Sequence, residues 1–268
     1  KGLFKLMKKV LVITGSRGEY GYIRPLLIKC KDKNRIGIDC QVLATNMHLL
    51  ESHGFSLDEF KKDNIEVKYK VWNTLDGNNN LTMVKSLFIF GLSLVDICSS
   101  EEFDAILLAG DRGEQLIGSI LGFHMNIPVI HIQAGERSGH IDGMSRHAIA
   151  RFAHIHLAAN KDAADRLEKF GEQKKRIKLI GAPQMDEIFK FKYNIEKTFE
   201  ELSISINGDF ALLVFHPVSE ELKTNFIQFK NCLNFLNTIK DLTLVAIFPN
   251  SDSGSELISN YLSNFLSD

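Results

Sequence analysis

Apolar residues along the chain follow two different spacings. Short runs of consecutive apolar, often β-branched residues predict buried strands at Lys9–Thr14, Ile38–Ala44, Asp104–Leu108, Pro128–Ile132, Ile155–Ala158 and Ile177–Ile180. Longer segments with helical spacing lie between them, at Tyr20–Lys31, Leu81–Ser100, Glu114–His124, Ser145–Ala153 and Asp162–Phe170. Continuous apolar strands between amphipathic helices are typical of a parallel sheet covered on both faces. The pattern therefore predicts an α/β fold.

A second strand-and-helix pattern begins near Phe210. Strands are expected at Ala211–Phe215 and Leu242–Phe248, after a polar stretch at Tyr193–Gly208 that we interpret as a linker. Two strands do not make a stable domain. We expect a first Rossmann-like domain over residues 1–192, and over residues 209–268 the start of a second Rossmann-like domain that is incomplete in this chain.

Composition narrows the classes of partner. The chain of 268 residues has 32 basic and 33 acidic residues, so neither nucleic acid nor an anionic membrane is expected as a partner. Its four cysteines are scattered, which favours reduced thiols in a cytoplasmic protein over a disulfide framework or a zinc site. No apolar run is expected to span a membrane.

The first candidate site loops follow predicted strands, where parallel sheets bind ligands. Thr14–Gly21 (TGSRGEYG) is a strand-to-helix turn whose amides and Arg17 suit an anion, although an ordinary glycine-rich turn is equally consistent. Gly110–Glu114 (GDRGE) offers Asp111 for proton transfer or orientation and Arg112 for phosphate. Taken alone, its acid and arginine form a surface salt bridge more often than a site.

The segment His131–His147 (HIQAGERSGHIDGMSRH) is the richest candidate. It places two acids, two arginines and three histidines on a loop between a strand and a helix. A structural loop rarely needs so many titratable groups, so a functional site is favoured over a solvated loop. His154 and His156 follow in an apolar context that favours at least one core histidine. In the second domain, His216–Pro217 and Pro249–Gly254 also end strands and are weak signals alone.

Taken in order, these segments resemble a known family. GSRGEYG, GDRGE, HIQAGERSGHIDG with RHAIARFAHIH, GAPQMDE, FHPVSEE and FPNSDSG are similar to the motifs of hydrolysing nucleotide-sugar 2-epimerases of sialic and legionaminic acid biosynthesis. The resemblance covers nearly the whole chain. It implies two Rossmann-like domains that face each other across a cleft, as in GT-B glycosyltransferases, with neither a metal nor a nicotinamide cofactor.

The resemblance also implies a substrate and roles for particular residues. The substrate is UDP- or GDP-N-acetylglucosamine, which is converted to N-acetylmannosamine and a nucleoside diphosphate through 2-acetamidoglucal. The family's acids correspond to Asp111 and Asp142, and its diphosphate contacts to Arg17, Arg112 and His216. The family's catalytic glutamate is replaced by Gln133, which cannot act as a base, so Glu136 is a second candidate carboxylate. Substrate-binding roles are also expected for Gly21, His48, Arg146, His147 and Asn250.

Other interpretations stay open. A catalytically silent sugar-nucleotide-binding protein would account for Gln133, and a GT-B glycosyltransferase would share the fold. Family members are about a third to a half longer, a difference of the size of part of a Rossmann-like domain, so we expect little turnover from this chain alone. Members associate as dimers or tetramers. The apolar helix at Leu81–Ile97 is a candidate interface, although a core position is the favoured interpretation.

Overall fold

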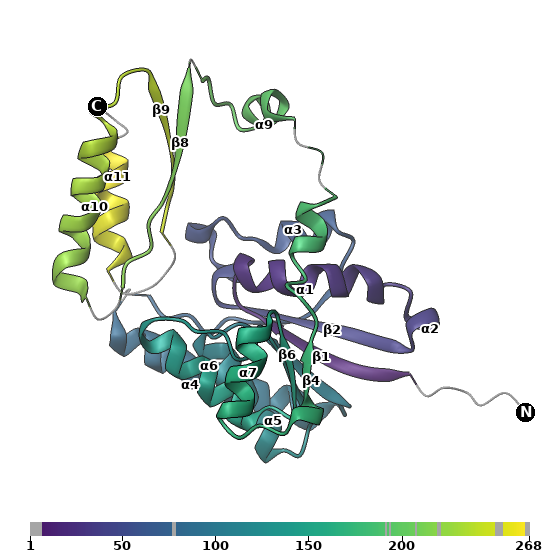
Figure 1. Cartoon of the computed structure of the whole chain (residues 1–268). Coiled ribbons are helices and arrows are strands. Elements are labelled where there is room, and N and C mark those ends of the chain that lie inside the picture. The colour runs from purple at the N-terminus through teal and green to yellow at the C-terminus, as the bar shows by residue number, and fades with distance from the viewer. Residues whose placement is uncertain are drawn as a thin grey trace, which may run out of the picture. The chain divides into compact units, whose positions relative to one another are not determined.

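The computed structural model describes residues 7–76, 79–190, 192, 194–206, 208–218, 221–249 and 254–265. The chain forms two compact units (Figure 1). The first comprises Lys1–Leu75 and Val84–Lys190, and the second comprises Asp76–Met83 and Phe191–Asp268. Each unit contains parallel strands flanked by helices, which confirms the predicted α/β class.

The first unit is built on one parallel sheet. In the described part of the chain this sheet has seven strands, in the order β3-β2-β1-β4-β5-β6-β7. The order changes direction between β1 and β4, the point at which such sheets bind ligands. The strands are β1 (Lys8–Thr14), β2 (Ile38–Thr45), β3 (Val67–Val71), β4 (Ala105–Ala109), β5 (Val129–Ile132), β6 (Ile155–Ala158) and β7 (Ile177–Leu179).

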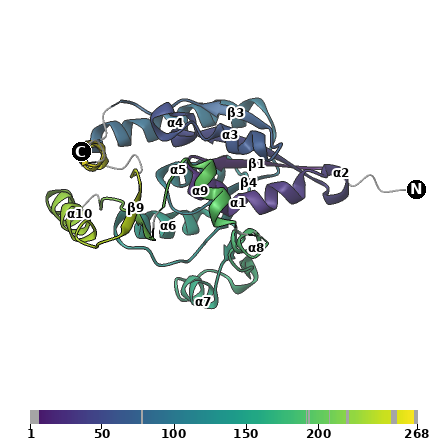
Figure 2. The ribbon, with the colours of Figure 1, turned by 90° about the horizontal axis from the view of Figure 1, so that it is seen from above.

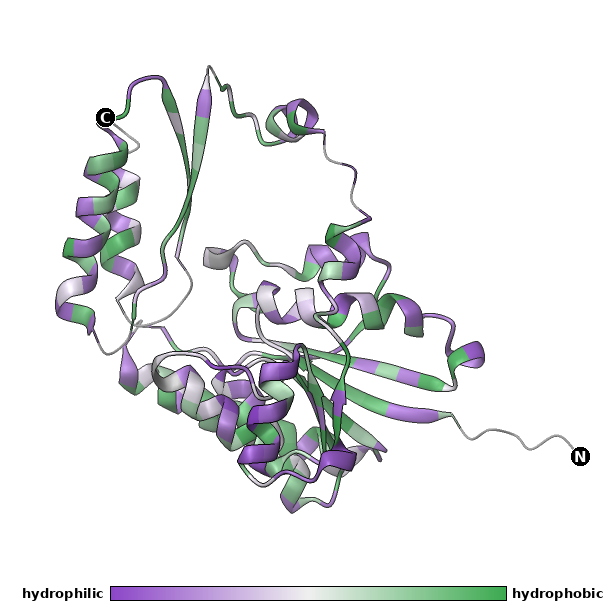
Figure 3. Ribbon diagram, viewed as in Figure 1, coloured by the Kyte–Doolittle hydropathy of each residue, from purple (hydrophilic) through white to green (hydrophobic). Residues whose placement is uncertain are grey.

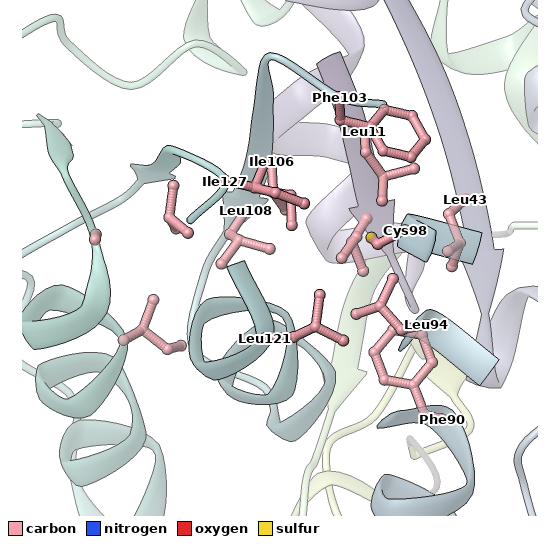
Figure 4. Packing of buried hydrophobic residues seen from close by; sticks show 14 of the residues in the cluster. Leu11, Leu43, Phe90, Leu94, Cys98, Phe103, Ile106, Leu108, Leu121 and Ile127 are labelled. Carbon is pink, nitrogen blue, oxygen red and sulfur yellow. The ribbon is translucent and has the colours of Figure 1, made fainter. Parts of the chain in front are cut away.

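Alternate residues of β1 pack into two separate cores. Leu11 and Ile13 belong to a cluster that also contains Phe90 (Figure 4), whereas Val10 and Val12 belong to a second cluster on the opposite face. A strand that is buried on both faces has a continuous apolar sequence. This is why apolar runs predict these strands, and Figure 3 shows the central strands as mostly hydrophobic.

Helices cover both faces of the sheet. Three of them, α4, α5 and α6, contribute residues to the cluster around Leu11, while α1 and α3 contribute to the cluster around Val10. Figure 2 shows α2 beside the start of β1, at the amino end of the sheet. The elements of this unit are α1 (Arg17–Cys30), α2 (Lys33–Ile36), η1 (Asn46–Leu49), η2 (Glu51–His53), α3 (Leu57–Lys62), α4 (Asn80–Ser100), α5 (Gly113–His124), α6 (His140–Phe152), α7 (Lys161–Lys169), η3 (Lys174–Arg176) and α8 (Met185–Ile188).

The apolar runs of the sequence do not reveal β3, the edge strand next to β2. Side chains along β3 alternate in exposure, and Lys68 and Lys70 point to solvent. A strand at the edge of a sheet has one face exposed to solvent, and lysines there also block pairing with strands of other chains. Its pattern is therefore alternating rather than continuously apolar.

Helix α4 has two apolar faces. Phe90, Leu94 and Cys98 are buried in the core, so the core interpretation holds for one face. A second apolar row is exposed and comprises Leu81, Val84, Phe88, Leu92 and Val95. By length and composition alone α4 could cross a membrane. The prediction that no apolar run reaches that length is therefore wrong.

The second unit contains the parallel pair β8 (Asp209–Val214) and β9 (Leu242–Ile247). Helices α10 (Leu222–Leu236) and α11 (Ser255–Phe265) lie on one side of this pair (Figure 1). Their buried residues Phe229, Leu233 and Ile258 pack with Leu213 and Leu244 of the strands. On the other face of β8, Leu212 and Val214 are exposed.

The predicted linker at Tyr193–Gly208 contains a helix, α9 (Ile195–Glu201), so interpreting the whole stretch as a linker is wrong. The Asn194 side chain caps this helix by accepting a hydrogen bond from the backbone amide of Lys197. The Phe199 ring also packs edge-on against Phe210 of β8, with the ring centres 5.1 Å apart. A polar composition does not prevent a short helix when a cap and one aromatic contact stabilise it.

Candidate active site

The predicted catalytic loops lie side by side at the carboxyl edge of the first sheet. Strands β1, β4 and β5 are neighbours, and their carboxyl ends lead into Gly15–Ser16, Gly110–Arg112 and Gln133–Gly139. Because parallel strands end at the same edge, loops that are far apart in sequence meet there. The site therefore lies at the point where the strand order reverses.

Asp111 is held in place by two side chains. Its Oδ2 atom forms an ion pair with the Arg146 guanidinium and accepts a hydrogen bond from Ser138 Oγ at 3.1 Å. Arg146 also donates from Nε to Ser138 Oγ at 3.2 Å, which closes a triangle of polar contacts. The arrangement therefore presents an oriented carboxylate at the edge of the sheet.

Arg146, which was expected to bind substrate, makes several contacts within the protein. Its side chain is buried, and besides Asp111 and Ser138 it donates from Nη1 to the backbone carbonyl of Gln133 at 2.7 Å. These contacts tie the loops after β4 and β5 to α6. Three of its five N–H donors are used within the protein, so Arg146 positions Asp111.

Gln133 occupies a strained position between β5 and α6. Its backbone φ is +61°, in the left-handed region that residues other than glycine rarely adopt, and its side chain is buried. The hydrogen bond from Arg146 to its carbonyl helps to hold this conformation. Strained residues of this kind concentrate at functional sites. A buried amide here can orient a ligand but cannot remove a proton.

The two other predicted carboxylates have different surroundings. Glu136 is partly buried and accepts a hydrogen bond on Oε1 from Asn160 Nδ2 at 3.0 Å, so it is linked to the residue that caps α7. Asp142 lies exposed in the first turn of α6. Accessible carboxylates can exchange protons with a ligand. The catalytic roles of Glu136 and Asp142 stay predictions.

Arg17 and Arg112 stand at the starts of two helices. Arg17 is the exposed first residue of α1, and Arg112 is the residue before the first turn of α5. The first amides of a helix carry partial positive charge and favour an anion. Two arginines at two neighbouring helix starts therefore place positive charge at this edge, as the predicted diphosphate contact requires.

The prediction that His48 binds substrate is not supported by its position. The ring is fully buried, with Nε2 3.0 Å from Thr14 Oγ1 and Nδ1 2.7 Å from Ser56 Oγ. Burial, followed by the charge of Arg17, lowers the pKa of His48 to about 4. Both ring nitrogens are thus occupied within the protein, and the neutral ring braces η1 against β1.

His147 and Gly21 also lie apart from the Asp111 network. The His147 ring packs edge-on against Phe170, with the ring centres 4.6 Å apart, and burial followed by Arg166 and Arg146 lowers its pKa. Gly21 lies within α1, and a Cβ atom added there would meet nothing within 4 Å. Nothing in the structure explains a glycine at position 21.

Two residues join the site that the sequence interpretation did not single out. The buried His131 ring lies 2.7 Å from the carbonyl of Gly110 through Nε2, and burial lowers its pKa to about 3. Because a carbonyl only accepts, neutral His131 donates from Nε2 and fixes the peptide before Asp111. The signal available in the sequence was its place two residues before Gln133.

Tyr22 of α1 is the second addition. A Cβ atom added to Gly110 would lie 3.6 Å from its ring, so the phenol packs beside the turn that leads into Asp111. Burial raises the pKa of Tyr22, Arg146 opposes this, and the charges of Asp111 and Glu136 add to it. Among the described residues its hydroxyl has no hydrogen-bond partner, which leaves that group available to a ligand.

The remaining predicted residues belong to the second unit. His216 is exposed in the segment after β8, and Asn250 lies outside the described residues. Their roles at the site stay predictions.

The sequence matches the family model described as UDP-N-acetylglucosamine 2-epimerase over residues 29–267. It is 32% identical over 262 residues to UDP-N,N′-diacetylbacillosamine 2-epimerase (hydrolyzing) of Legionella pneumophila, covering 97% of this chain and 69% of the relative. It is 30% identical over 266 residues to UDP-N-acetylglucosamine 2-epimerase of Neisseria meningitidis serogroup B, covering 98% of this chain and 68% of that relative.

The fold is similar to that of a solved 2-epimerase structure. The crystal structure of UDP-GlcNAc 2-epimerase from Neisseria meningitidis bound to UDP-GlcNAc matches with a TM-score of 0.75 at 20% identity. The match covers 95% of this chain and 70% of the solved chain. At that identity the likeness establishes the GT-B-like fold.

Proposed function

Because the chain belongs to the UDP-N-acetylglucosamine 2-epimerase family, we propose that the complete protein is a hydrolysing nucleotide-sugar 2-epimerase. The proposed reaction converts UDP- or GDP-N-acetylglucosamine to N-acetylmannosamine and a nucleoside diphosphate, for nonulosonic acid biosynthesis. The observation that carries the proposal is the oriented Asp111 carboxylate, held by Arg146 and Ser138 beside two arginine-bearing helix starts.

The chemistry needs a carboxylate and fixed positive charge at the same edge. The hydrogen on C2 of the sugar is barely acidic, so its removal must accompany cleavage of the bond between C1 and the diphosphate oxygen. In the proposed step a carboxylate takes the C2 proton, the C–H electrons form the C1–C2 double bond, and the C1–O electrons leave with the diphosphate. Arg17 and Arg112 would stabilise the leaving charge.

The second half of the reaction adds water to 2-acetamidoglucal. Hydroxyl adds at C1, and a proton returns to C2 from the opposite face, which inverts that centre. The proposal assigns proton transfer to Asp111 and Asp142, with Glu136 as a further candidate, because Gln133 cannot accept a proton. His131 and Arg146 hold the peptide and the carboxylate of this loop in place.

The donor sugar is the open part of the proposal. The relative from Legionella pneumophila is named for UDP-N,N′-diacetylbacillosamine, so a 2,4-diacetamido sugar stands beside N-acetylglucosamine as a candidate. We propose a cytoplasmic location, where nucleotide sugars are made and where the free thiols of Cys30, Cys40, Cys98 and Cys232 would stay reduced.

The test is to incubate the complete protein with each candidate donor in deuterated water and to follow the sugar by proton NMR. The proposal expects a free 2-epimerised sugar deuterated at C2, and Asp111→Asn should abolish it. Asp58→Asn, at an exposed residue of α3, is the matched control and should keep full turnover. Binding without product would favour the silent binding protein, and transfer to a sugar acceptor would favour the glycosyltransferase.

We also propose that the protein is a homo-oligomer that pairs through α4. The exposed residues Phe88, Leu92 and Val95 border an apolar groove of about 400 Å³ between α4 and α5, lined on the α5 side by Ile117 and Ile120. An apolar surface of this kind marks an interaction site.

The charges on α4 favour a second copy as the occupant. Lys85 and Asp96 are its only charged residues, and they lie about three turns apart on the same edge of the exposed apolar row. In an antiparallel pair of α4 helices related by a twofold axis, Lys85 of each copy lies beside Asp96 of the other.

A further inference from the structure

A five-residue pattern occurs twice at the carboxyl edge of the sheet. Gly15–Glu19 (GSRGE) follows β1 and Gly110–Glu114 (GDRGE) follows the adjacent strand β4. Each pattern ends with a glutamate in the first turn of a helix, Glu19 in α1 and Glu114 in α5. Both side chains are buried, each residue being 3% exposed. Glutamate is rarely buried to this extent, so the pair requires an explanation.

Glu19 has too few partners for a buried charge. Its Oε2 atom accepts a hydrogen bond from the backbone amide of Gly15, while Oε1 has no hydrogen-bond partner among the described residues. Burial and then the charge of Glu114 raise the pKa of Glu19 to about 8, against the opposing effects of Arg112, the Gly15 amide and Gln115. Glu19 is therefore mostly protonated at neutral pH.

The carboxyl group of Glu114 has more polar contacts than that of Glu19. Its Oε1 atom accepts a hydrogen bond from Asn46 Nδ2, and its Oε2 atom lies 3.9 Å from Arg112 Nε. Asn46 follows β2 and has a φ of +49°, so Glu114 also ties down the turn after a third strand. Both glutamates thus lie buried at the same edge, and the charge of Glu114 disfavours a second negative charge on Glu19, so Glu19 is the member of the pair that keeps its proton.

We propose that Glu19 and Glu114 form a buried acid pair that holds one proton and thereby controls how strongly the neighbouring edge attracts an anion. Arg17 and Arg112 stand in the same two loops. The two arginines and two glutamates carry a formal charge of +1 together while the proton is bound, and zero after it leaves. Anion affinity at this edge therefore falls when the pair loses its proton.

The identity of the anion rests on the proposed function, in which the ligand is the diphosphate of a nucleotide sugar. The acid pair itself does not depend on that function. Two other titratable groups near Glu19 do not change their charge over this pH range. Tyr22 on α1 stays neutral because burial raises its pKa. His48 of η1 is neutral, and both of its ring nitrogens are occupied. The Gln115 side chain is uncharged and donates to the Ile13 carbonyl.

The first experiment measures the pair without any ligand. Thermal unfolding is followed between about pH 5 and pH 9 for the wild type, Glu19→Gln and Glu114→Gln. The folded state binds the Glu19 proton more tightly than the unfolded state, so wild-type stability falls as pH rises from the ordinary glutamate range to about 8. Glutamine mimics the protonated side chain, so the Tm of Glu19→Gln should exceed that of the wild type by roughly 3–10 °C at pH 9, and the difference should be much smaller at pH 5.

Glu114→Gln tests whether the charge of Glu114 acts on Glu19. If Glu114 had only a structural role, this change would not alter the pH range over which stability is lost. Removing the Glu114 charge lowers the pKa of Glu19, so the pH-dependent loss of stability should end at a lower pH than in the wild type. Equal pH dependence in the wild type and Glu19→Gln would overturn the proposal. If a variant fails to fold, carbon NMR of wild-type glutamate carboxyls decides, because the proposal requires one that titrates near pH 8.

The second experiment adds UDP as the anionic probe and measures its Kd by calorimetry with the complete protein. Between about pH 7 and pH 9, wild-type affinity should weaken roughly fivefold more than that of Glu19→Gln. Equal weakening would show that the pair does not control anion affinity. If UDP fails to bind at either pH, the proposed function is refuted, while the ligand-free experiment still decides whether the acid pair exists.

Discussion

The Arg146 guanidinium forms an ion pair with the Asp111 carboxylate, joining α6 to the loop after β4 across 35 positions of sequence. The pair is mostly buried. Ser138 Oγ donates a hydrogen bond to Asp111 and accepts one from Arg146. An arginine in this position fixes the direction of the acid beside it. The proposed proton transfer depends on that orientation.

Replacing Arg146 should reduce both turnover and stability. Arg146→Met leaves Asp111 without its ion pair and the Gln133 carbonyl without its donor, so we expect a loss of roughly 100-fold in kcat and about 2–3 kcal/mol in the free energy of unfolding. Arg151→Met is the control, because the Arg151 side chain is 62% exposed in its ion pair with Glu172. That change should cost less than about 1 kcal/mol. Unchanged kcat in Arg146→Met would contradict the assigned role.

Two tyrosines of α1 should respond differently to loss of the hydroxyl. Tyr20 donates a hydrogen bond to Asp63 at 2.5 Å, so Tyr20→Phe should lower the free energy of unfolding by about 1–2 kcal/mol. Tyr22→Phe should leave stability unchanged and reduce kcat or UDP affinity roughly tenfold, because its hydroxyl faces the region of Asp111 and Glu136. Urea unfolding and steady-state kinetics of both variants separate the two roles. Equal loss of stability in the two would refute the distinction.

The buried histidines should make the protein sensitive to acid. His48 and His131 have lowered pKa values of about 4 and about 3. The unfolded chain binds protons to these rings below about pH 6.5 while the folded chain does not, so stability falls as pH decreases below that value.

The measurement compares urea unfolding at pH 7 and pH 5. His48→Gln should lose roughly 1–2 kcal/mol less than the wild type over this interval. His124→Gln, at an exposed position in the last turn of α5, is the matched control and should behave like the wild type. An unchanged acid sensitivity in His48→Gln would mean that this ring is not held neutral.

Charge exchange on α4 tests the proposed pairing of two copies. Lys85→Glu places like charges together across the twofold axis and should shift the protein towards monomer in sedimentation velocity experiments. The double variant Lys85→Glu with Asp96→Lys restores opposite charges and should recover the oligomer. Lys61→Glu on the exposed surface of α3 should have no effect. A wild type that is monomeric at all concentrations would refute the pairing, and binding of that monomer to lipid vesicles would instead point to a membrane as the occupant of the α4 surface.

Local sequence patterns determined much of the fold. Apolar runs predicted six strands of the first sheet. The runs are continuous in β4 and in most of β1, because strands buried on both faces need apolar residues at every position. Lys68 and Lys70 concealed the seventh strand, since an edge strand keeps a wet face. The helix over Ile195–Glu201 was also missed, because its stability comes from a cap and a contact with Phe210 rather than from an apolar face.

The tertiary structure alone decided what the site residues do. The sequence could place Asp111 and Gln133 at strand ends, since parallel strands end at one edge. It could not show that Arg146 turns inward, that both nitrogens of His48 are occupied, or that Glu19 and Glu114 share a buried environment. The role of a polar side chain depends on burial and on partners brought close by folding. Some of those partners, such as Asp111 for Arg146 and Thr14 for His48, lie more than 30 residues away, where no local pattern predicts them.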